Sequence, residues 1–289
     1  MIIFNKSFRL IKKLAMGTIL ITTFLSLSIN VYSNEKPGKG KSVQPSRANW
    51  DTFWFGGAVL EIGLEKLGYK VKSPKTLTSA TRYPALGNGD VDYSSDAVMP
   101  NATNFFNKVE DSVELIGPIM NPGSIQGYLI DKKTNEKYNI TNINEMKNPE
   151  IVKIFDSDRD GKANLVGCNP GWNCDKIATH HLKAYGLNKT VQHMQGEYNI
   201  LVGDAVARYK NGQPVFLYAW YPNTATVQML PGKDLVWLQV PYTDLPMEGN
   251  FNTKIEGVVG CAAKTDLCNL GWTATQYFIA ANKDWLSDN

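Results

Sequence analysis

Apolar and polar positions along the chain follow two rhythms, one typical of helices and one typical of strands. The spacing predicts helices over 58–68, 143–155, 174–187 and 199–213, a shorter helix before a turn at 87–89, and strands over 69–74, 91–95, 126–138, 214–220, 233–242 and 275–282. Gly68 and Gly186 end two of these helices, as glycine commonly does. Because helices and strands alternate throughout, the pattern favours an α/β fold with mostly parallel sheets.

The first 33 residues have the order of a secretory signal. Four basic residues and no acid precede or flank an uncharged, mostly apolar stretch at 14–31, and the small Ser33 ends the segment. We therefore expect cleavage after Ser33 and release into the periplasm. The alternative is that the apolar stretch stays as a single membrane anchor, since its length lies near that of a membrane span. No cysteine lies near the cleavage point, so no lipid anchor is expected there.

Composition narrows the classes of function. Removing residues 1–33 takes away four basic residues, so the formal net charge falls from +3 to about −1. Nucleic acids require a basic surface, so no nucleic-acid partner is expected. The remaining length suits one large domain or two lobes. The four cysteines form two close pairs, and an exported protein can oxidise such pairs.

Two of the seven tryptophans stand where a ligand could reach them. Trp172 lies between Cys168 and Cys174, and Trp220 ends an apolar strand just before Pro222. Ligands of open α/β sheets bind beyond the carboxyl ends of strands. An indole face attracts a cation, and a quaternary ammonium group suits it because its methyl groups donate no ordinary hydrogen bonds. The alternative interpretation is that Trp172 only fills its own loop.

The residues after Trp172 offer a complementary site for an anion. Asn173 and Cys174 precede a helix expected to begin near Asp175, and free N–H groups at helix starts favour anions. A cross-link in this short segment would also fix its backbone. One turn could then hold both halves of a zwitterion such as a betaine.

Six stretches carry a family resemblance. They are LEKLGYKV (64–71), QGYLIDKKT (126–134), ITNINEMKNPEI (140–151), GKANLVGCNPGW (161–172), ARYKNGQPVF (207–216) and PGKDLVWLQVPY (231–242). They resemble the glycine betaine/proline betaine-binding periplasmic proteins of osmoprotectant ABC importers. The resemblance runs from about residue 38 to residue 285 and is densest in the middle.

The resemblance implies a type II-like periplasmic binding protein fold, in which two α/β lobes joined by crossing strands close on a ligand. Residues 34–124 and 243–289 are then expected to form the first lobe, and residues 125–242 the second. The expected partners are a small zwitterionic or cationic ligand and the permease subunits of an importer in the inner membrane. The protein is expected to be a monomer and not an enzyme.

The resemblance also implies roles for particular residues. Cys168 and Cys174 are expected to form a disulfide, and Trp172 and Trp220 to belong to the family's aromatic box. The amides of Asn173 and Cys174 match the turn that binds the ligand carboxylate, although the family usually has Gly at the first of these positions.

The chain departs from the family pattern at the third tryptophan of the box and at a ligand-binding histidine. Aligned on Pro100, these positions are Val98 and Ala102. Trp50 or Trp54 is expected to replace the missing ring, and Tyr93, Tyr218, Tyr221 and Asn101 are weaker candidates. The ligand can therefore differ from glycine betaine itself, and choline, taurine and sulfonium compounds are the alternatives.

Two further departures concern the C-terminal part. Cys261 and Cys268 form an additional pair, expected to cross-link a loop of the first lobe. Family members usually continue beyond the position of Asn289 with residues that complete the first lobe, so the resemblance implies a truncated C-terminal part.

Other groups of polar residues point less clearly to chemistry. Asp156, Asp158 and Asp160 alternate before a glycine, which resembles the start of a calcium loop, but the twelfth position lacks the usual Glu. The alternative is an Asp- and Gly-rich turn with solvated charges. No cofactor is expected apart from this possible calcium ion. The three histidines form no pattern of a zinc site or catalytic triad. An exported hydrolase using Asp96 with Glu197 is the alternative from another class of function.

Overall fold

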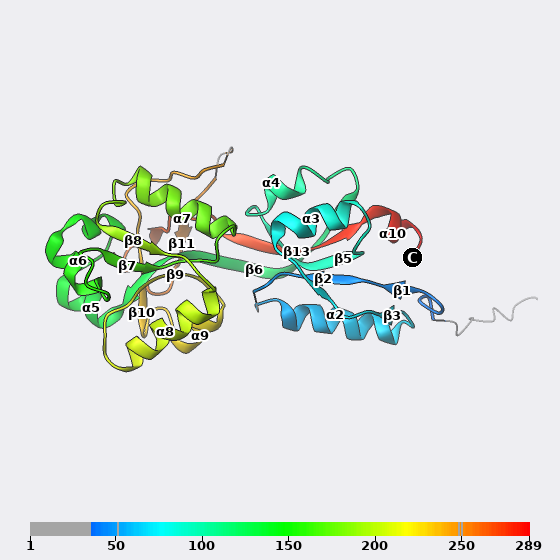
Figure 1. Ribbon diagram of the computed structural model, residues 1–289, viewed down its shortest axis with the longest axis horizontal. Coiled ribbons are helices and arrows are strands. Elements are labelled where there is room, and N and C mark those ends of the chain that lie inside the picture. Colours follow the sequence, from blue (N-terminus) through cyan, green and yellow to red (C-terminus); the bar gives the residue numbers. More distant parts are fainter. Residues whose placement is uncertain (1–35, 51, 248, 250) are drawn as a thin grey trace, which may run out of the picture.

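The computed structural model describes residues 36–50, 52–247, 249 and 251–289, and it shows two α/β lobes side by side (Figure 1). The expected signal segment, residues 1–33, lies outside the described residues. Within the described part of the chain, no helix combines the length and apolar character that crossing a membrane requires.

The first lobe contains a parallel arrangement of short strands covered by helices. Its elements are β1 (Ser42–Val43), β2 (Pro45–Arg47), α2 (Trp54–Lys66), β3 (Lys70–Val71), β4 (Lys75–Thr76), α3 (Ser79–Gly87), β5 (Tyr93–Met99), α4 (Thr103–Phe106) and, from the C-terminal end, α10 (Lys283–Ser287). β2 pairs in parallel with β4 on one side and β5 on the other. Its buried apolar residues form two small clusters, one around Leu86 and Val113 and one around Val43 and Tyr93.

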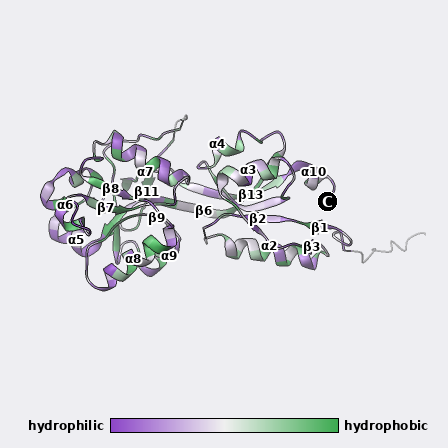
Figure 2. Ribbon diagram, in the orientation of Figure 1, coloured by the Kyte–Doolittle hydropathy of each residue, from purple (hydrophilic) through white to green (hydrophobic). Residues whose placement is uncertain are grey.

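The second lobe holds the larger hydrophobic core. Its elements are α5 (Lys132–Tyr138), a 3-10 helix (Ile143–Lys147), α6 (Pro149–Phe155), β7 (Ala163–Val166), α7 (Asn173–Ala184), β8 (Val191–Met194), α8 (Tyr198–Lys210), β9 (Phe216–Tyr221), α9 (Thr224–Gln228), β10 (Leu235–Leu238), β11 (Lys254–Glu256) and β12 (Leu267–Asn269). Figure 2 shows hydrophobic residues along β7 and β9, inside the layer of helices. The predicted apolar runs at 214–220 and 233–242 are therefore buried strands of this sheet.

Two long strands connect the lobes. β6 (Val113–Asp131) pairs with β13 (Thr275–Asn282) between Val113 and Ser124, and with β9 from Ile125 onwards. Both pairings are antiparallel. β6 leaves the first lobe and β13 returns to it, whereas β9 stays within the second lobe. The prediction of mostly parallel sheets was therefore wrong for the centre of the molecule, where antiparallel ladders join parallel sheets on either side.

Part of the segment after residue 243 packs against the second lobe. Gly260 and Ala262 exchange backbone hydrogen bonds with Trp237 of β10, and Cys261 and Cys268 belong to the core of the second lobe. The Cys261–Cys268 disulfide, with Cα atoms 6.1 Å apart, therefore cross-links a loop of the second lobe. Our prediction that it cross-links a loop of the first lobe was wrong. We propose a boundary just before β13, since that strand is the first part of 243–289 to pair with β5.

Two element boundaries also differ from the predictions. The strand predicted over 126–138 ends at Asp131, and residues 132–138 form α5, because the Asp131 side chain caps the helix by accepting from the Thr134 amide. The helix predicted near Asp175 begins at Asn173.

Candidate functional site

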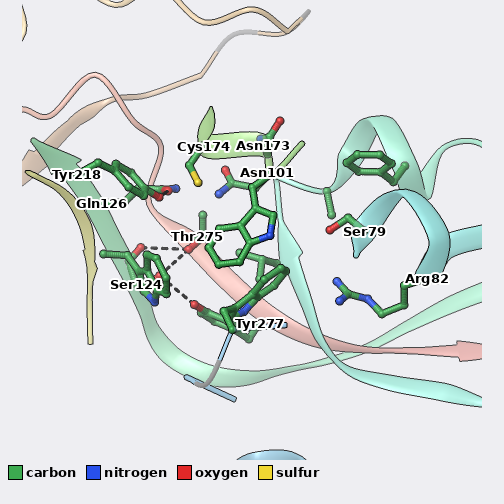
Figure 3. A pocket seen from close by; sticks show the side chains of 16 residues that line it. Ser79, Arg82, Asn101, Ser124, Gln126, Asn173, Cys174, Tyr218, Thr275 and Tyr277 are labelled. Atoms are coloured by element: carbon green, nitrogen blue, oxygen red, sulfur yellow. Dashed lines mark hydrogen bonds between the residues drawn. The ribbon is translucent and has the colours of Figure 1, made fainter. Parts of the chain in front are cut away.

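A cavity lies between the lobes, at the crossing strands (Figure 3). Its volume is about 80 Å³, enough for a small ligand group. Sixteen residues line it: Trp50, Ser79, Arg82, Val98, Asn101, Ala102 and Phe105 from the first lobe, Ser124, Gln126, Thr275 and Tyr277 from the crossing strands, and Trp172, Asn173, Cys174, Tyr218 and Trp220 from the second lobe. The cavity therefore combines an aromatic wall with neutral polar groups and one arginine.

Trp172 is positioned by the short ring that precedes α7. Cys168 and Cys174 form a disulfide with Cα atoms 6.2 Å apart, so the chain must turn tightly between them. Gly171 adopts φ +85°, a backbone conformation that favours glycine, and Trp172 follows as the N-cap of α7. The disulfide-closed loop holds the indole of Trp172 at the N-terminus of α7, with only 8% of the residue exposed.

Trp220 is positioned by its place near the C-terminal end of a buried strand, β9. β9 is apolar from Phe216 to Trp220, and its backbone pairs with the second half of β6. The indole stacks on Tyr198 of α8, with ring centroids 4.9 Å apart and an interplanar angle of 26°. The hydroxyl of Thr226 donates to the Trp220 carbonyl over 3.0 Å and fixes the chain where the strand ends.

Trp50 brings a third indole from the other lobe. Its ring lies 5.3 Å from that of Trp172 at 74°, and Trp172 lies 6.4 Å from Trp220 at 62°. The three rings are thus neighbours in one wall. Trp54 does not line the cavity: it is 39% exposed, donates to the Ala48 carbonyl and packs beneath Arg47. Of the two expected replacements for the ring missing at Val98, the structure brings Trp50 to the cavity.

The two indoles of the second lobe are hydrogen-bonded to the first lobe. The Trp172 Nε1–H donates to Oδ1 of Asn49 over 3.1 Å, and the Trp220 Nε1–H donates to Oγ1 of Thr52 over 2.9 Å. Both acceptors lie in the turn between β2 and α2. These bonds can form only when the lobes approach each other, so they couple the orientation of the rings to closure.

Removing these acceptors is expected to speed ligand release. Asn49→Ala and Thr52→Val should each weaken binding about fivefold, since a buried hydrogen bond contributes about 1 kcal/mol. The loss should fall mainly on the dissociation rate, because the bonds form after the lobes close. Stopped-flow tryptophan fluorescence measures both rates. Thr76→Val is the control, because the Thr76 hydroxyl accepts from Arg47 within one lobe. Equal dissociation rates for the Thr52 and Thr76 variants would refute the coupling.

The first turn of α7 presents free donors beside the aromatic wall. The amides of Asn173 and Cys174 have no carbonyl partner within the helix, because they belong to its first turn. Asp175 does not occupy them: its carboxylate accepts from the Gly171 amide over 3.1 Å and from the Gln195 side chain. The side-chain amide nitrogen of Asn173 is buried and has no partner among the described residues. This end of the cavity can therefore accept an anionic group.

The crossing strands contribute neutral hydroxyl and amide groups. Ser124 is 2.8 Å from the Thr275 hydroxyl and 3.5 Å from that of Tyr277 (dashed in Figure 3), and Tyr218 donates to Gln126 over 2.7 Å. Burial raises the pKa of Tyr277 to about 12 and raises that of Tyr218 well above its ordinary value. Both phenols are thus uncharged at neutral pH, and they add no negative charge to the cavity.

The remaining candidate residues divide into those that line the cavity and those that do not. Val98, Ala102, Asn101 and Tyr218 line the cavity. Tyr221 is 45% exposed and is not among the lining residues, because its side chain alternates to the opposite face from Trp220. Tyr93 lies in a core cluster of the first lobe.

Sequence reasoning missed seven lining residues: Ser79, Arg82, Phe105, Ser124, Gln126, Thr275 and Tyr277. Four of them carry a signal that could have been used, since Ser124 with Gln126 and Thr275 with Tyr277 stand two apart and so share one face of a strand. The other three come together only through the packing of α3 and α4 of the first lobe.

The acidic loop lies away from this cavity. One carboxylate oxygen from each of Asp156, Asp158 and Asp160 lies within 4.8 Å of the other two, and Asp158 and Asp160 are exposed. Asp156 already accepts from the amides of Asp160 and Gly161. These bonds suit an Asp-rich turn, and a calcium site there stays a prediction.

The two acids of the hydrolase hypothesis are engaged in separate lobes. Asp96 is 1% exposed and pairs with Arg82 of the first lobe, whereas Glu197 accepts from Asn169 of the second. Neither lines the cavity. The arrangement offers no pair of carboxylates to one substrate.

Comparison with known proteins agrees with this geometry. Residues 41–289 match the family model described as the substrate-binding domain of ABC-type glycine betaine transport systems. The chain is 38% identical over 276 residues to the glycine betaine/proline betaine-binding periplasmic protein of Escherichia coli K12, covering 94% of this chain and 81% of that protein. It is 36% identical over 280 residues to the glycine betaine-binding periplasmic protein of Dickeya dadantii, covering 96% and 81%.

Solved structures share the fold. The glycine betaine/L-proline-binding protein of Borrelia burgdorferi has a TM-score of 0.62 at 18% identity, over 86% of this chain and 78% of that one. A lactococcal protein in its closed conformation with glycine betaine has a TM-score of 0.61 at 19% identity, over 86% and 80%. These two matches show that the fold is shared, and the predicted fold class is confirmed.

Proteins of this family bind a substrate for an ABC transporter and are not enzymes, which removes the hydrolase hypothesis. The match covers both lobes, the crossing strands and the aromatic wall. The chain therefore belongs to the family of substrate-binding domains of ABC-type glycine betaine transport systems.

Proposed function

We propose that this protein captures glycine betaine, or a closely related methylated zwitterion, in the periplasm and delivers it to the permease of an ABC importer. The observation that carries the proposal is the contact between three indoles, Trp50, Trp172 and Trp220, in the wall of one cavity between the lobes. Periplasmic relatives that bind glycine betaine support both the ligand class and the location.

The chemistry of the two halves of the ligand fits the two parts of the cavity. A trimethylammonium group spreads its charge over methyl groups, so it gains from the electron-rich faces of rings and needs no hydrogen-bond acceptor. Among the described residues, no acid lines the cavity to compete with the rings. A carboxylate, by contrast, suits the free amides of Asn173 and Cys174, where the dipole of α7 adds to its attraction.

Lobe closure follows from the distribution of these groups. Trp50 belongs to the first lobe, and the other two indoles and the amides of α7 belong to the second. A ligand that contacts both sets binds the closed form more tightly than the open form, and this difference in affinity drives closure. The permease can then recognise the closed, ligand-bound protein. We propose that the protein acts as a monomer.

Isothermal titration calorimetry with a ligand panel tests the function. We expect saturable one-to-one binding of glycine betaine or proline betaine, with a change in tryptophan emission because all three rings change their surroundings. Choline, taurine and a dimethylsulfonium acid are the comparison ligands. Absence of heat and of emission change for every methylated compound in the panel would contradict the proposal.

A further inference from the structure

Arg82 has a position that the proposed function leaves without a role. It lies on α3, is 1% exposed, and extends from the helix towards the middle of the cavity (Figure 3). It is the one charged residue among the described residues that line the cavity. A buried guanidinium is costly unless its charge and its donors are compensated, so its partners define what it can still bind.

The compensation of Arg82 within the protein is incomplete. Its Nη1 lies 3.4 Å from Oδ1 of Asp96 and donates to the Leu77 carbonyl over 3.3 Å, both long contacts. Its Nε is buried and has no hydrogen-bond partner among the described residues. The guanidinium therefore keeps donor capacity.

Asp96 is shared with other donors. The Ser94 hydroxyl donates to its Oδ1 over 2.6 Å, and the Ala48 amide donates to its Oδ2. Asp96 itself does not line the cavity. The carboxylate thus holds the strand β5 and the turn after β2 in place, and it compensates the charge of Arg82 from a position outside the cavity lining.

The neighbours of Arg82 on the cavity side carry no charge. The guanidinium carbon lies 5.2 Å from the ring centroid of Trp50 and 5.8 Å from that of Tyr83. Burial raises the pKa of the Tyr83 phenol to about 12, so this ring stays neutral. The positive charge consequently lies next to Trp50, the ring that the first lobe contributes to the aromatic wall.

Val98 and Ala102 connect this observation with the departures from the family pattern. Both small side chains line the same cavity as Arg82, at the positions where the resemblance places a tryptophan and a histidine. Trp50 supplies a ring in place of the first. Arg82 offers a hydrogen-bond donor in the same cavity, and its planar guanidinium can donate to both oxygens of a carboxylate.

We propose that Arg82 makes the cavity selective for zwitterions by donating to the anionic group of the ligand and by repelling cations that lack such a group. This inference rests on the proposed function, and it narrows the substrate class to methylated zwitterions that carry a carboxylate. Arginine–carboxylate hydrogen bonds are short and charge-assisted. A bare quaternary cation such as choline gains nothing from the guanidinium and meets a like charge in a buried site.

The test compares glycine betaine with choline by calorimetry on the full chain and on two variants. Arg82→Gln combined with Asp96→Asn removes both charges of the pair together, so neither partner is left buried alone. We expect glycine betaine to bind about tenfold more weakly to this double variant, since a hydrogen bond to a charged group is lost. Choline binding should be unchanged or tighter. Arg82→Lys, which keeps the charge, should retain the preference for glycine betaine.

The outcomes separate this inference from the proposed function. Equal weakening of both ligands, or no weakening of glycine betaine, in a double variant that unfolds cooperatively would overturn the role of Arg82 alone. The role of Arg82 would also be overturned if the wild type bound choline more tightly than glycine betaine. Failure of the wild type to bind either ligand would refute the proposed function and the inference with it.

Discussion

Trp220→Ala is expected to weaken glycine betaine binding about 30-fold, because a desolvated indole face contributes about 2 kcal/mol to the binding of a quaternary ammonium group. Trp220 carries this effect more directly than the other rings, since its position at the end of β9 and its stacking on Tyr198 fix its face. Isothermal titration calorimetry gives the affinity. Trp220→Phe should recover much of it while losing the bond to Thr52.

Trp54→Ala is the matched control for this experiment. Trp54 also follows the turn after β2, but it is 39% exposed and does not line the cavity. Its removal should leave the affinity for glycine betaine unchanged. If the Trp54 and Trp220 variants lost affinity equally, the rings would act through the general stability of the lobes, and the aromatic wall would not be the binding site.

Asp96→Ala is expected to lower the free energy of unfolding by about 3–5 kcal/mol, because it leaves the buried guanidinium of Arg82 without its counter-charge. It also removes the acceptor of the Ala48 amide and the Ser94 hydroxyl. Urea unfolding followed by circular dichroism measures the effect. The variant should unfold at a clearly lower urea concentration than the wild type.

An exposed ion pair in the second lobe provides the comparison. Glu150 and Lys153 are 2.7 Å apart, but their side chains are 76% and 70% exposed. Glu150→Ala should change the free energy of unfolding by less than about 1 kcal/mol, since solvent screens such pairs. A loss for Asp96→Ala as small as that for Glu150→Ala would show that the buried pair is not required for the fold of the first lobe.

Local signals in the sequence were sufficient for the elements that hold the second half of the site. The apolar run of β9, the glycine-rich turn before α7 and the spacing of Cys168 and Cys174 all act over short distances, so Trp172 and Trp220 could be placed before the structure was known. The predicted strand over 275–282 coincides with β13.

Features that depend on contacts between distant segments could not be predicted in this way. The first half of β6 contains Gly117 and Pro118, which weaken a strand pattern, and it is held by β13, far along the chain. Trp50 and Trp54 are equivalent in the sequence, and only the approach of the second lobe distinguishes them. Arg82 looks like an ordinary helical surface residue until the packing of α3 against β5 buries it beside Asp96.

The most direct test of the aromatic wall is a crystal structure of the protein grown with glycine betaine. We predict the methyl groups within about 6 Å of the ring centroids of Trp50, Trp172 and Trp220, the range in which a cation interacts with an aromatic face. The carboxylate should point away from these rings, towards hydrogen-bond donors. Glycine betaine bound outside this cavity, or with its methyl groups turned away from all three indoles, would contradict the account.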